Sequence, residues 1–133
     1  MRNSILLTAS LFAIALLVSC KKDEGKGGKH SITGKVYARN YSRSTHTYTS
    51  TSYPAEEEDI YIIYGDDPSY GDKQKTNYDG SFEFKYLQKG KYKVYAYSDD
   101  STNSSASGKV AVIKELTIGS EKITTVPDIT ILK

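Results

Sequence analysis

The chain has 133 residues, with 18 Lys and Arg against 16 Asp and Glu and a formal net charge of +2 at pH 7. This near-neutral balance gives no field that would steer the protein toward nucleic acid, so we expect no nucleic-acid partner. The composition also includes twelve tyrosines, no tryptophan and a single cysteine. One cysteine excludes a disulfide within the chain, and the length suits one hydrophobic core.

The first residues have the pattern of an export signal. Arg2 precedes an apolar run over residues 5–18, which is too short to span a bilayer as a helix. Residues 17–20, Leu-Val-Ser-Cys, resemble a bacterial lipobox. The resemblance implies that residues 1–19 are a signal peptide and that Cys20 becomes the acylated (palmitate-type) first residue of a lipoprotein. An ordinary signal peptide with an incidental cysteine is the alternative.

Residues 20–30 are expected to be the acylated cysteine and a flexible tether, since Gly and charged residues bury too little apolar area to fold. Residues 21–24, Lys-Lys-Asp-Glu, resemble signals that send lipoproteins of some Gram-negative bacteria to the cell surface. We therefore predict a lipid-anchored outer-membrane protein exposed on the cell surface. The inner leaflet of the outer membrane is the alternative location.

From residue 31 onward the apolar residues have the period of β-strands. Residues 31–39 alternate, with Ile32, Val36 and Ala38 on one face. Residues 40–53 are rich in Ser, Thr and Tyr without a clear period, and form either an exposed ribbon or a flexible loop. Residues 60–64 are continuously apolar, which is typical of a central strand covered on both faces.

The clearest pattern lies in residues 76–98. Phe82 and Phe84 alternate with polar residues, and a second alternating run follows Gly90, so this segment predicts a pair of half-buried strands. Tyr86 and Tyr92 are assigned to the core face of this pair.

Two further strands are predicted over residues 109–118 and 123–132, and Pro127 places the last one at an edge or a bulge. With about seven short strands and no helical period after Cys20, the sequence predicts an all-β sandwich over residues 31–133.

The hairpin residues also have a recognisable spacing, formed by Asn77, Asp79, Gly80, Phe82, Phe84, Leu87, Gly90, Tyr92, Val94 and Ala96. This spacing resembles the carboxypeptidase regulatory-like family, whose fold is a seven-stranded transthyretin-like, Ig-like β-sandwich. Residues 40–59 are longer and more polar than the first connection of that family. The resemblance implies a single sandwich and says little about function, because this fold hosts unrelated activities.

Residues suited to catalysis are sparse. His30 and His46 have no partner at a metal-ligand spacing, so we predict no enzyme and no cofactor other than the lipid. A calcium site would require acidic loops to converge, from Asp66, Asp67, Asp72, Asp99 and Asp100. Such residues are more commonly turn formers, so we assign no metal site.

The tyrosines suggest a recognition surface. Tyr37, Tyr95 and Tyr97 fall on outward strand faces, where a stiff amphipathic ring suits either cross-strand packing or ligand binding. The sequence favours a non-enzymatic adhesion, scaffold or accessory binding module with a protein or glycan partner. The alternative is a carbohydrate-binding module that captures surface glycans.

Overall fold

The structure, a computed structural model, describes residues 23–133, and every helix or strand element in that range is a β-strand. In chain order these are β1 (Lys26–Arg39), β2 (Tyr41–Ser42), β3 (Thr47–Tyr48), β4 (Tyr53–Pro54), β5 (Asp59–Tyr64), β6 (Asp72–Lys75), β7 (Ser81–Leu87), β8 (Gly90–Asp99), β9 (Lys109–Ile118), β10 (Ile123–Thr125) and β11 (Ile129–Leu132). Within this part of the chain no helix has the length and apolar character needed to cross a membrane. The predicted signal peptide lies outside the described residues.

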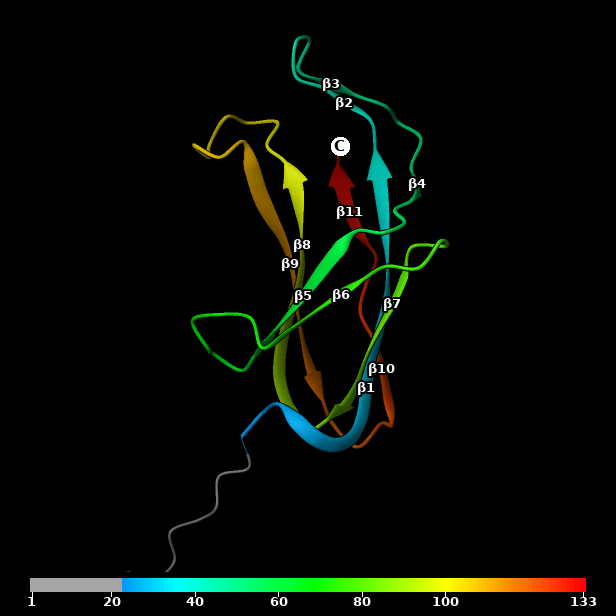
Figure 1. Cartoon of the computed structure of the whole chain (residues 1–133), viewed down its shortest axis with the longest axis vertical. Helices are drawn as coiled ribbons and strands as arrows, with labels where there is room; N and C mark the ends of the chain where they lie inside the picture. Colours follow the sequence, from blue (N-terminus) through cyan, green and yellow to red (C-terminus); the bar gives the residue numbers. More distant parts are fainter. Residues whose placement is uncertain (1–22) are drawn as a thin grey trace, which may run out of the picture.

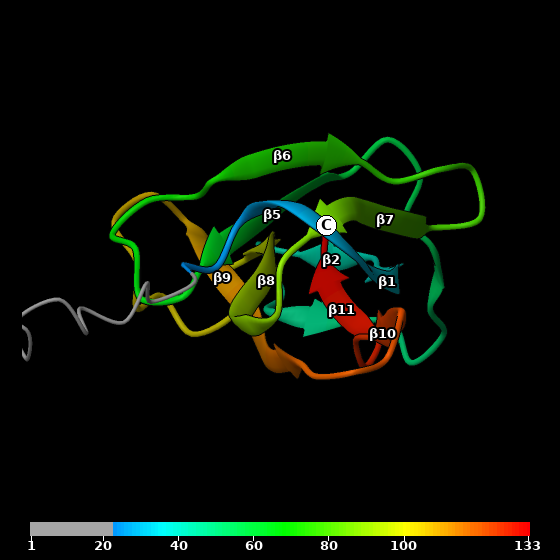
Figure 2. The ribbon, with the colours of Figure 1, turned by 90° about the horizontal axis from the view of Figure 1, so that it is seen from below.

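The strands form two layers. β6, β5, β8 and β9 make a four-stranded antiparallel sheet in that order, and β7, β4, β10 and β11 pair around β1. Figures 1 and 2 show β5, β8 and β9 on one side of the molecule and β1, β7, β10 and β11 on the other. The predicted all-β, sandwich-like class is confirmed, with eleven strands in place of about seven because several are only two or three residues long.

β1 is the central strand of its sheet. Its first half pairs with β7 and β10, and its second half pairs with β4 and β11. Ile32, Val36 and Ala38 are fully buried, as the alternation predicted. Each half of β1 therefore has a strand on either side, and these strands supply hydrogen-bond partners for its main-chain N–H and C=O groups.

The segment predicted to be a tether contributes to this sheet from Lys26 onward. Gln88 Nε2 donates to the Lys26 carbonyl oxygen at 3.1 Å, and the Gly25 N–H donates to the buried Tyr92 hydroxyl at 2.9 Å. Gly28 lies so close to the Leu87 carbonyl that a Cβ would overlap it. Small residues here allow the close approach of two main chains. The Gly-rich composition, which predicted a flexible tether, therefore serves packing instead.

β7 buries the predicted residues with one exception. Phe82 and Phe84 are 3% and 0% exposed, whereas Tyr86, assigned to the core face, is 69% exposed. Tyr86 has a φ of 61°, in the left-handed region, which interrupts the alternation of the strand. The next residue, Leu87, turns into the core, so Leu87 occupies the place predicted for Tyr86.

β5 is central in its sheet, as predicted, but it is not covered on both faces. Ile60 and Ile62 are fully buried between the layers, while Tyr61 and Ile63 are only partly buried on the opposite face. The outer face of the four-stranded sheet is therefore open.

Residues 40–58 form a small hairpin, β2–β3, and then the short strand β4. The hairpin is joined to the sheet by an ion pair between Arg43 and Asp99, with 2.9 Å between Nη2 and Oδ1. Pro127 falls between β10 and β11, so the single strand predicted over residues 123–132 is two short strands, with the proline in neither.

Replacement of Phe84 tests this packing. Phe84→Ala should lower the free energy of unfolding by about 3–5 kcal/mol, because the ring is fully buried and its removal leaves a cavity. Chemical denaturation measures the loss. The neighbouring exposed position provides the control, and Lys85→Ala should stay within about 0.5 kcal/mol of the unmodified protein. Equal losses for the two variants would contradict the strand parity.

Candidate functional site

The candidate site is the outer face of the four-stranded sheet. Alternate residues of each strand point away from the core, and the register places Tyr61 of β5 beside Tyr95 of β8 and Tyr95 beside Ile113 of β9. Tyr97 lies two residues further along β8 on the same face. Lys73 of β6 pairs with Tyr61 and completes the row at the other end.

The centre of this face is a stacked tyrosine pair. The rings of Tyr61 and Tyr95 are 4.9 Å apart between centroids with an interplanar angle of 10°. The ammonium group of Lys73 lies 5.7 Å from the centroid of the Tyr61 ring. Because the two rings cover each other, one face of each ring is closed to a ligand, and Tyr95 is only 8% exposed. The pair is therefore a rigid base rather than an open stacking surface.

Two further tyrosines stand against this base. Tyr97 lies almost equally far from both stacked rings, with centroid distances of 5.7 Å to Tyr61 and 5.6 Å to Tyr95 and near-perpendicular ring planes. Tyr70, from the β5–β6 loop, meets Tyr61 edge-on at 5.1 Å. Tyr97 and Tyr70 are 45% and 51% exposed. We call Tyr61, Tyr70, Tyr95 and Tyr97 the tyrosine platform.

Charged groups border the platform. Lys73 Nζ lies 3.4 Å from Asp59 Oδ2, and a hydrogen bond to Asp59 raises the pKa of Lys73. Burial raises the pKa of the Tyr61 hydroxyl, and the nearby Asp59 carboxylate adds to the increase. Both effects keep the border in its ordinary charge state, with a neutral phenol beside a cation, at neutral pH.

A shallow hollow continues this outer face toward the β8 turn. It encloses about 440 Å³ and is lined by Gly65, Asp66, Lys91, Tyr92, Lys93, Glu115, Leu116 and Thr117. Lys93 precedes Tyr95 by two residues on the same side of β8, so the hollow begins roughly 7 Å from the platform. This volume lies within the ~300–1,000 Å³ typical of ligand sites.

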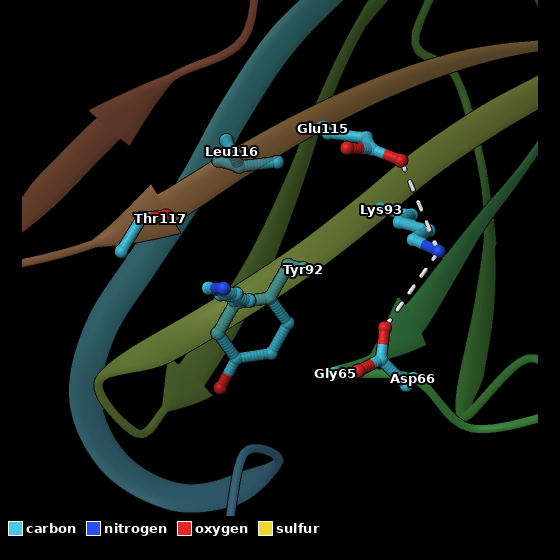
Figure 3. A pocket seen from close by; sticks show the side chains of 8 residues that line it. Gly65, Asp66, Tyr92, Lys93, Glu115, Leu116 and Thr117 are labelled. Atoms are coloured by element: carbon cyan, nitrogen blue, oxygen red, sulfur yellow. Dashed lines mark ion pairs between the residues drawn. The ribbon is translucent and has the colours of Figure 1, made fainter.

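Polar groups meet inside the hollow. Figure 3 shows the Lys93 side chain between the carboxylates of Asp66 and Glu115, which come from the β5–β6 loop and β9. Lys93 Nζ is 3.9 Å from Asp66 Oδ1 and 3.8 Å from Glu115 Oε1. Both carboxylates are largely in water, with side-chain exposures of 99% and 74%. They can therefore turn toward a ligand at little cost in lost ion pairing.

The structure gathers two of the three predicted tyrosines. Tyr95 and Tyr97 belong to the platform, whereas Tyr37 lies in β1, where it pairs with Pro54 and Thr130 in the other sheet. The three candidate residues Tyr37, Tyr95 and Tyr97 are thus divided between the two layers. Cys20, the predicted lipid site, lies outside the described residues.

The five aspartates proposed for calcium lie at separate places. Asp66 and Asp67 sit in the β5–β6 turn and Asp72 pairs with Lys26 at 2.6 Å, whereas Asp99 and Asp100 lie at the far end of β8. Among residues 23–133 no group of three or more His, Cys, Asp or Glu side chains is placed to hold a metal ion.

Asp100 illustrates what such aspartates do here. Its carboxylate accepts hydrogen bonds from the N–H groups of Thr102 and Ser105 at 2.8 and 2.7 Å and from the Thr102 hydroxyl. These bonds hold the pKa of Asp100 well below its usual range. The carboxylate therefore organises the β8–β9 loop.

The sequence analysis included Tyr61 in the strand over residues 60–64 without assigning it to the recognition surface, and it did not select Tyr70 or Ile113. Tyr61 follows Ile60 directly, so alternation could have placed its side chain on the outer face. Its contact with Tyr95 depends on the register between β5 and β8, which is not visible in the sequence. Tyr70 reaches the platform from a loop, so no periodicity marks it. Ile113 was included in a predicted strand, and its 50% exposure results from its position at the sheet edge.

Comparison with known proteins gives a fold-level likeness. No protein-family model matches the chain, and no curated protein matches it. Among solved structures the chain is similar to a candidate carbohydrate-binding protein from Pseudomonas aeruginosa, with a TM-score of 0.49 and 14% sequence identity over 82% of this chain and 91% of that chain. A likeness at this level carries no functional argument, and membership of the carboxypeptidase regulatory-like family stays a prediction.

The protonation of Tyr95 is a direct test of the platform. Burial raises the pKa of Tyr95 from 10.0 to about 12, and the Tyr97 hydroxyl adds to the shift. Between these two values the unfolded chain loses the proton while the folded chain keeps it, so the free energy of unfolding should fall as pH rises from 10 to 12.

Denaturation measured across this pH range, with ultraviolet titration of tyrosinate, checks the expectation. Tyr95→Phe should make the fall less steep, whereas Tyr78→Phe, at a position that is 85% exposed, should leave it unchanged. Identical pH profiles for the unmodified protein and Tyr95→Phe would mean that Tyr95 is not buried in the platform.

Proposed function

We propose that the protein is a non-enzymatic carbohydrate-binding module and that the tyrosine platform holds the sugar. The observation that supports this most directly is the pair of exposed rings, Tyr70 and Tyr97, each set at a steep angle against the same partly buried ring, Tyr61. An aromatic ring offers an apolar face to the C–H groups of a sugar and a hydroxyl to its polar rim.

Rigidity favours binding at this place. Tyr61 and Tyr95 are fixed by their strands and by each other, so the exposed rings that rest on them lose little further freedom when a ligand arrives. Ordering a mobile side chain costs about 0.5–1.5 kcal/mol on association, and a preformed platform avoids most of that cost.

The hollow supplies the polar contacts that a sugar requires. Asp66, Lys93 and Glu115 offer acceptors and donors on the same face, and Lys93 lies two residues along β8 from Tyr95 of the platform. The site is open, and its carboxylates are mainly in water, which suits hydrogen bonding to hydroxyl groups. A general acid or base has to be held in place beside the reacting atom, whereas these exposed carboxylates can turn, so we propose binding without turnover.

Replacing the exposed rings tests the proposal. Tyr97→Ala and Tyr70→Ala should each weaken glycan binding by about 2 kcal/mol, or roughly thirtyfold, the cost of losing an aromatic residue central to an interface. A glycan array identifies the ligand, and titration calorimetry with the retained glycan measures the affinity.

Tyr78→Ala is the matched control, because Tyr78 is the most exposed large hydrophobic residue within residues 23–133 and lies in the β6–β7 turn outside the platform. It should bind as the unmodified protein does. An array without any retained glycan, or equal losses in all three variants, would overturn the carbohydrate proposal.

A protein partner is the second candidate, in an adhesion, scaffold or accessory role. The exposed Ile113 beside the platform favours it, because clusters of exposed aliphatic and aromatic residues mark protein interfaces. Loss of partner binding in Tyr97→Ala, together with an empty glycan array, would support this function over the first.

We also propose that Cys20 carries the lipid and that the module is displayed at the outer membrane, on the strength of the lipobox-like residues 17–20 and the charged residues 21–24. Membrane fractionation and protease treatment of intact cells test this. The unmodified protein should be membrane-bound and cleaved from outside, and Cys20→Ala should leave the membrane fraction. Fractionation of Cys20→Ala with the membrane would refute the anchor, and a protected but membrane-bound protein would place the module on the periplasmic side.

A further inference from the structure

β9 forms an open edge of the four-stranded sheet. It is ten residues long, and within residues 23–133 it pairs with β8 alone (Figure 1). Edge strands in monomeric proteins are commonly short, bulged or covered, because unpaired main-chain groups recruit other strands. The pairing of β9 with β8 is regular from Lys109 to Ile118, so this edge is long and has no bulge.

The direction of its free main-chain groups can be derived from β8. The Lys91 carbonyl accepts from Gly65 on the β5 side at 2.8 Å, and the Asp100 N–H donates to Gly108 on the β9 side at 3.0 Å. Since successive residues of a strand direct their groups to opposite sides, even-numbered residues of β8 bond to β9. In β9 the partners are also even-numbered, so Ala111, Ile113 and Glu115 direct their N–H and C=O groups at the open edge.

We propose that two copies of this chain pair antiparallel through their β9 edges, with Val112 opposite Val112 of the second copy. This register sets Ala111 opposite Ile113 of the second copy and Lys109 opposite Glu115 of the second copy, twice each by symmetry. Each pair of odd-numbered residues then exchanges two main-chain hydrogen bonds. The two sheets join into one continuous sheet.

Charge complementarity supports this occupant. Lys109 already pairs with Asp99 of β8 at 2.6 Å, and Glu115 pairs with Lys93 of β8 at 3.8 Å. Across the joined sheet the outer row becomes Asp99, Lys109, Glu115 and Lys93, the last two from the second copy. The charges alternate in sign along this row of four residues, so every neighbouring pair in the row is a pair of opposite charges.

The apolar row matches in the same register. Tyr97 and Ala111 of one copy meet Ile113 and Tyr95 of the second copy, so the 50% exposed Ile113 gains an apolar neighbour. Shifting the axis to Ile113 sets Ala111 against Glu115, and shifting it to Ala111 sets Ile113 against Lys109. Centring on Lys114 places two like charges face to face, which is destabilising. Only the register centred on Val112 places opposite charges together in the charged row and apolar side chains together in the apolar row.

Lys114 is compatible with this arrangement. It is partly buried on the inner side of β9 and lies opposite Val110 of the second copy. A lysine stem can cover an aliphatic neighbour while its ammonium stays in water. The Lys114 charge disfavours the register centred on Lys114, where it would face its own copy. It therefore selects among the possible registers and does not prevent edge pairing altogether.

The pairing would place two tyrosine platforms on the same side of one sheet. The inference does not depend on what the platform binds, since β9 supplies the edge and the register. Where the ligand carries repeated units, two linked sites raise the overall affinity without new contacts. The dimer can therefore be tested without knowledge of the ligand.

Disulfide trapping tests the register in the full chain. Cys20 is the only cysteine, so the variants carry Cys20→Ser. Val112→Cys should give a covalent dimer under mild oxidation, because directly opposed side chains of a non-hydrogen-bonded pair come within disulfide range. Lys114→Cys is the matched control on the same face of β9 and should be trapped at least about tenfold less, since its counterpart is Val110. Equal trapping, or none, would overturn the proposed register.

A main-chain substitution tests the edge itself. Ala111→Pro removes an N–H that faces the open edge and leaves the ladder to β8 intact, whereas Ala111→Val keeps the N–H. Light scattering in detergent should give twice the protein mass of one chain for the unmodified protein and Ala111→Val, and the mass of one chain for Ala111→Pro. Circular dichroism confirms that both variants are folded. A single-chain mass for the unmodified protein would overturn the proposal and leave the edge to a strand from another protein.

Discussion

The arrangement depends on the register between β5 and β8. With Ile60 paired to Ala96 and Tyr61 to Tyr95, every apolar residue of the inner row meets the core while the tyrosines meet each other outside. Because side chains alternate along a strand, a slip of one residue would bury Tyr61 and expose Ile60 and Ile62. Burying the aliphatic residues therefore fixes the outer tyrosines in contact, and the platform is a consequence of core packing.

The sequence predicted much of the core, because alternation is local information. Phe82, Phe84, Tyr92 and Val94 are buried as their spacing indicated. The prediction was wrong at Tyr86, because one left-handed residue reverses the parity at the end of β7 and no neighbour in the sequence announces it.

The predicted tether shows a different limit. Composition alone made residues 26–30 a flexible segment, whereas the structure uses the same glycines to bring two main chains together beside Leu87. Low hydrophobicity indicates how little a segment can bury, but it does not exclude that a neighbouring strand supplies the hydrogen bonds.

Prediction of the site was limited by topology. Tyr95 and Tyr97 share a face of one strand, so their proximity could be predicted. Tyr37, the third candidate for the recognition surface, lies in a strand of the other layer, which the sequence does not show. Tyr70 reaches the platform only because the β5–β6 loop folds back on Tyr61. Contacts that depend on which strands become neighbours carry no period, and a single sequence does not contain them.

The outer face and the open edge are linked by one strand. β9 contributes Ile113 to the border of the platform and also carries the free main-chain groups of Ala111 and Ile113. A sheet that must keep one face open for a ligand cannot cover that face with a helix or a loop. The edge strand of such a sheet is then also left uncovered. Pairing two such edges hides main-chain groups and Ile113 while leaving Tyr70 and Tyr97 open. Self-association through β9 is thus compatible with ligand binding, because the hydrogen bonds lie in the plane of the sheet and the ligand lies above it.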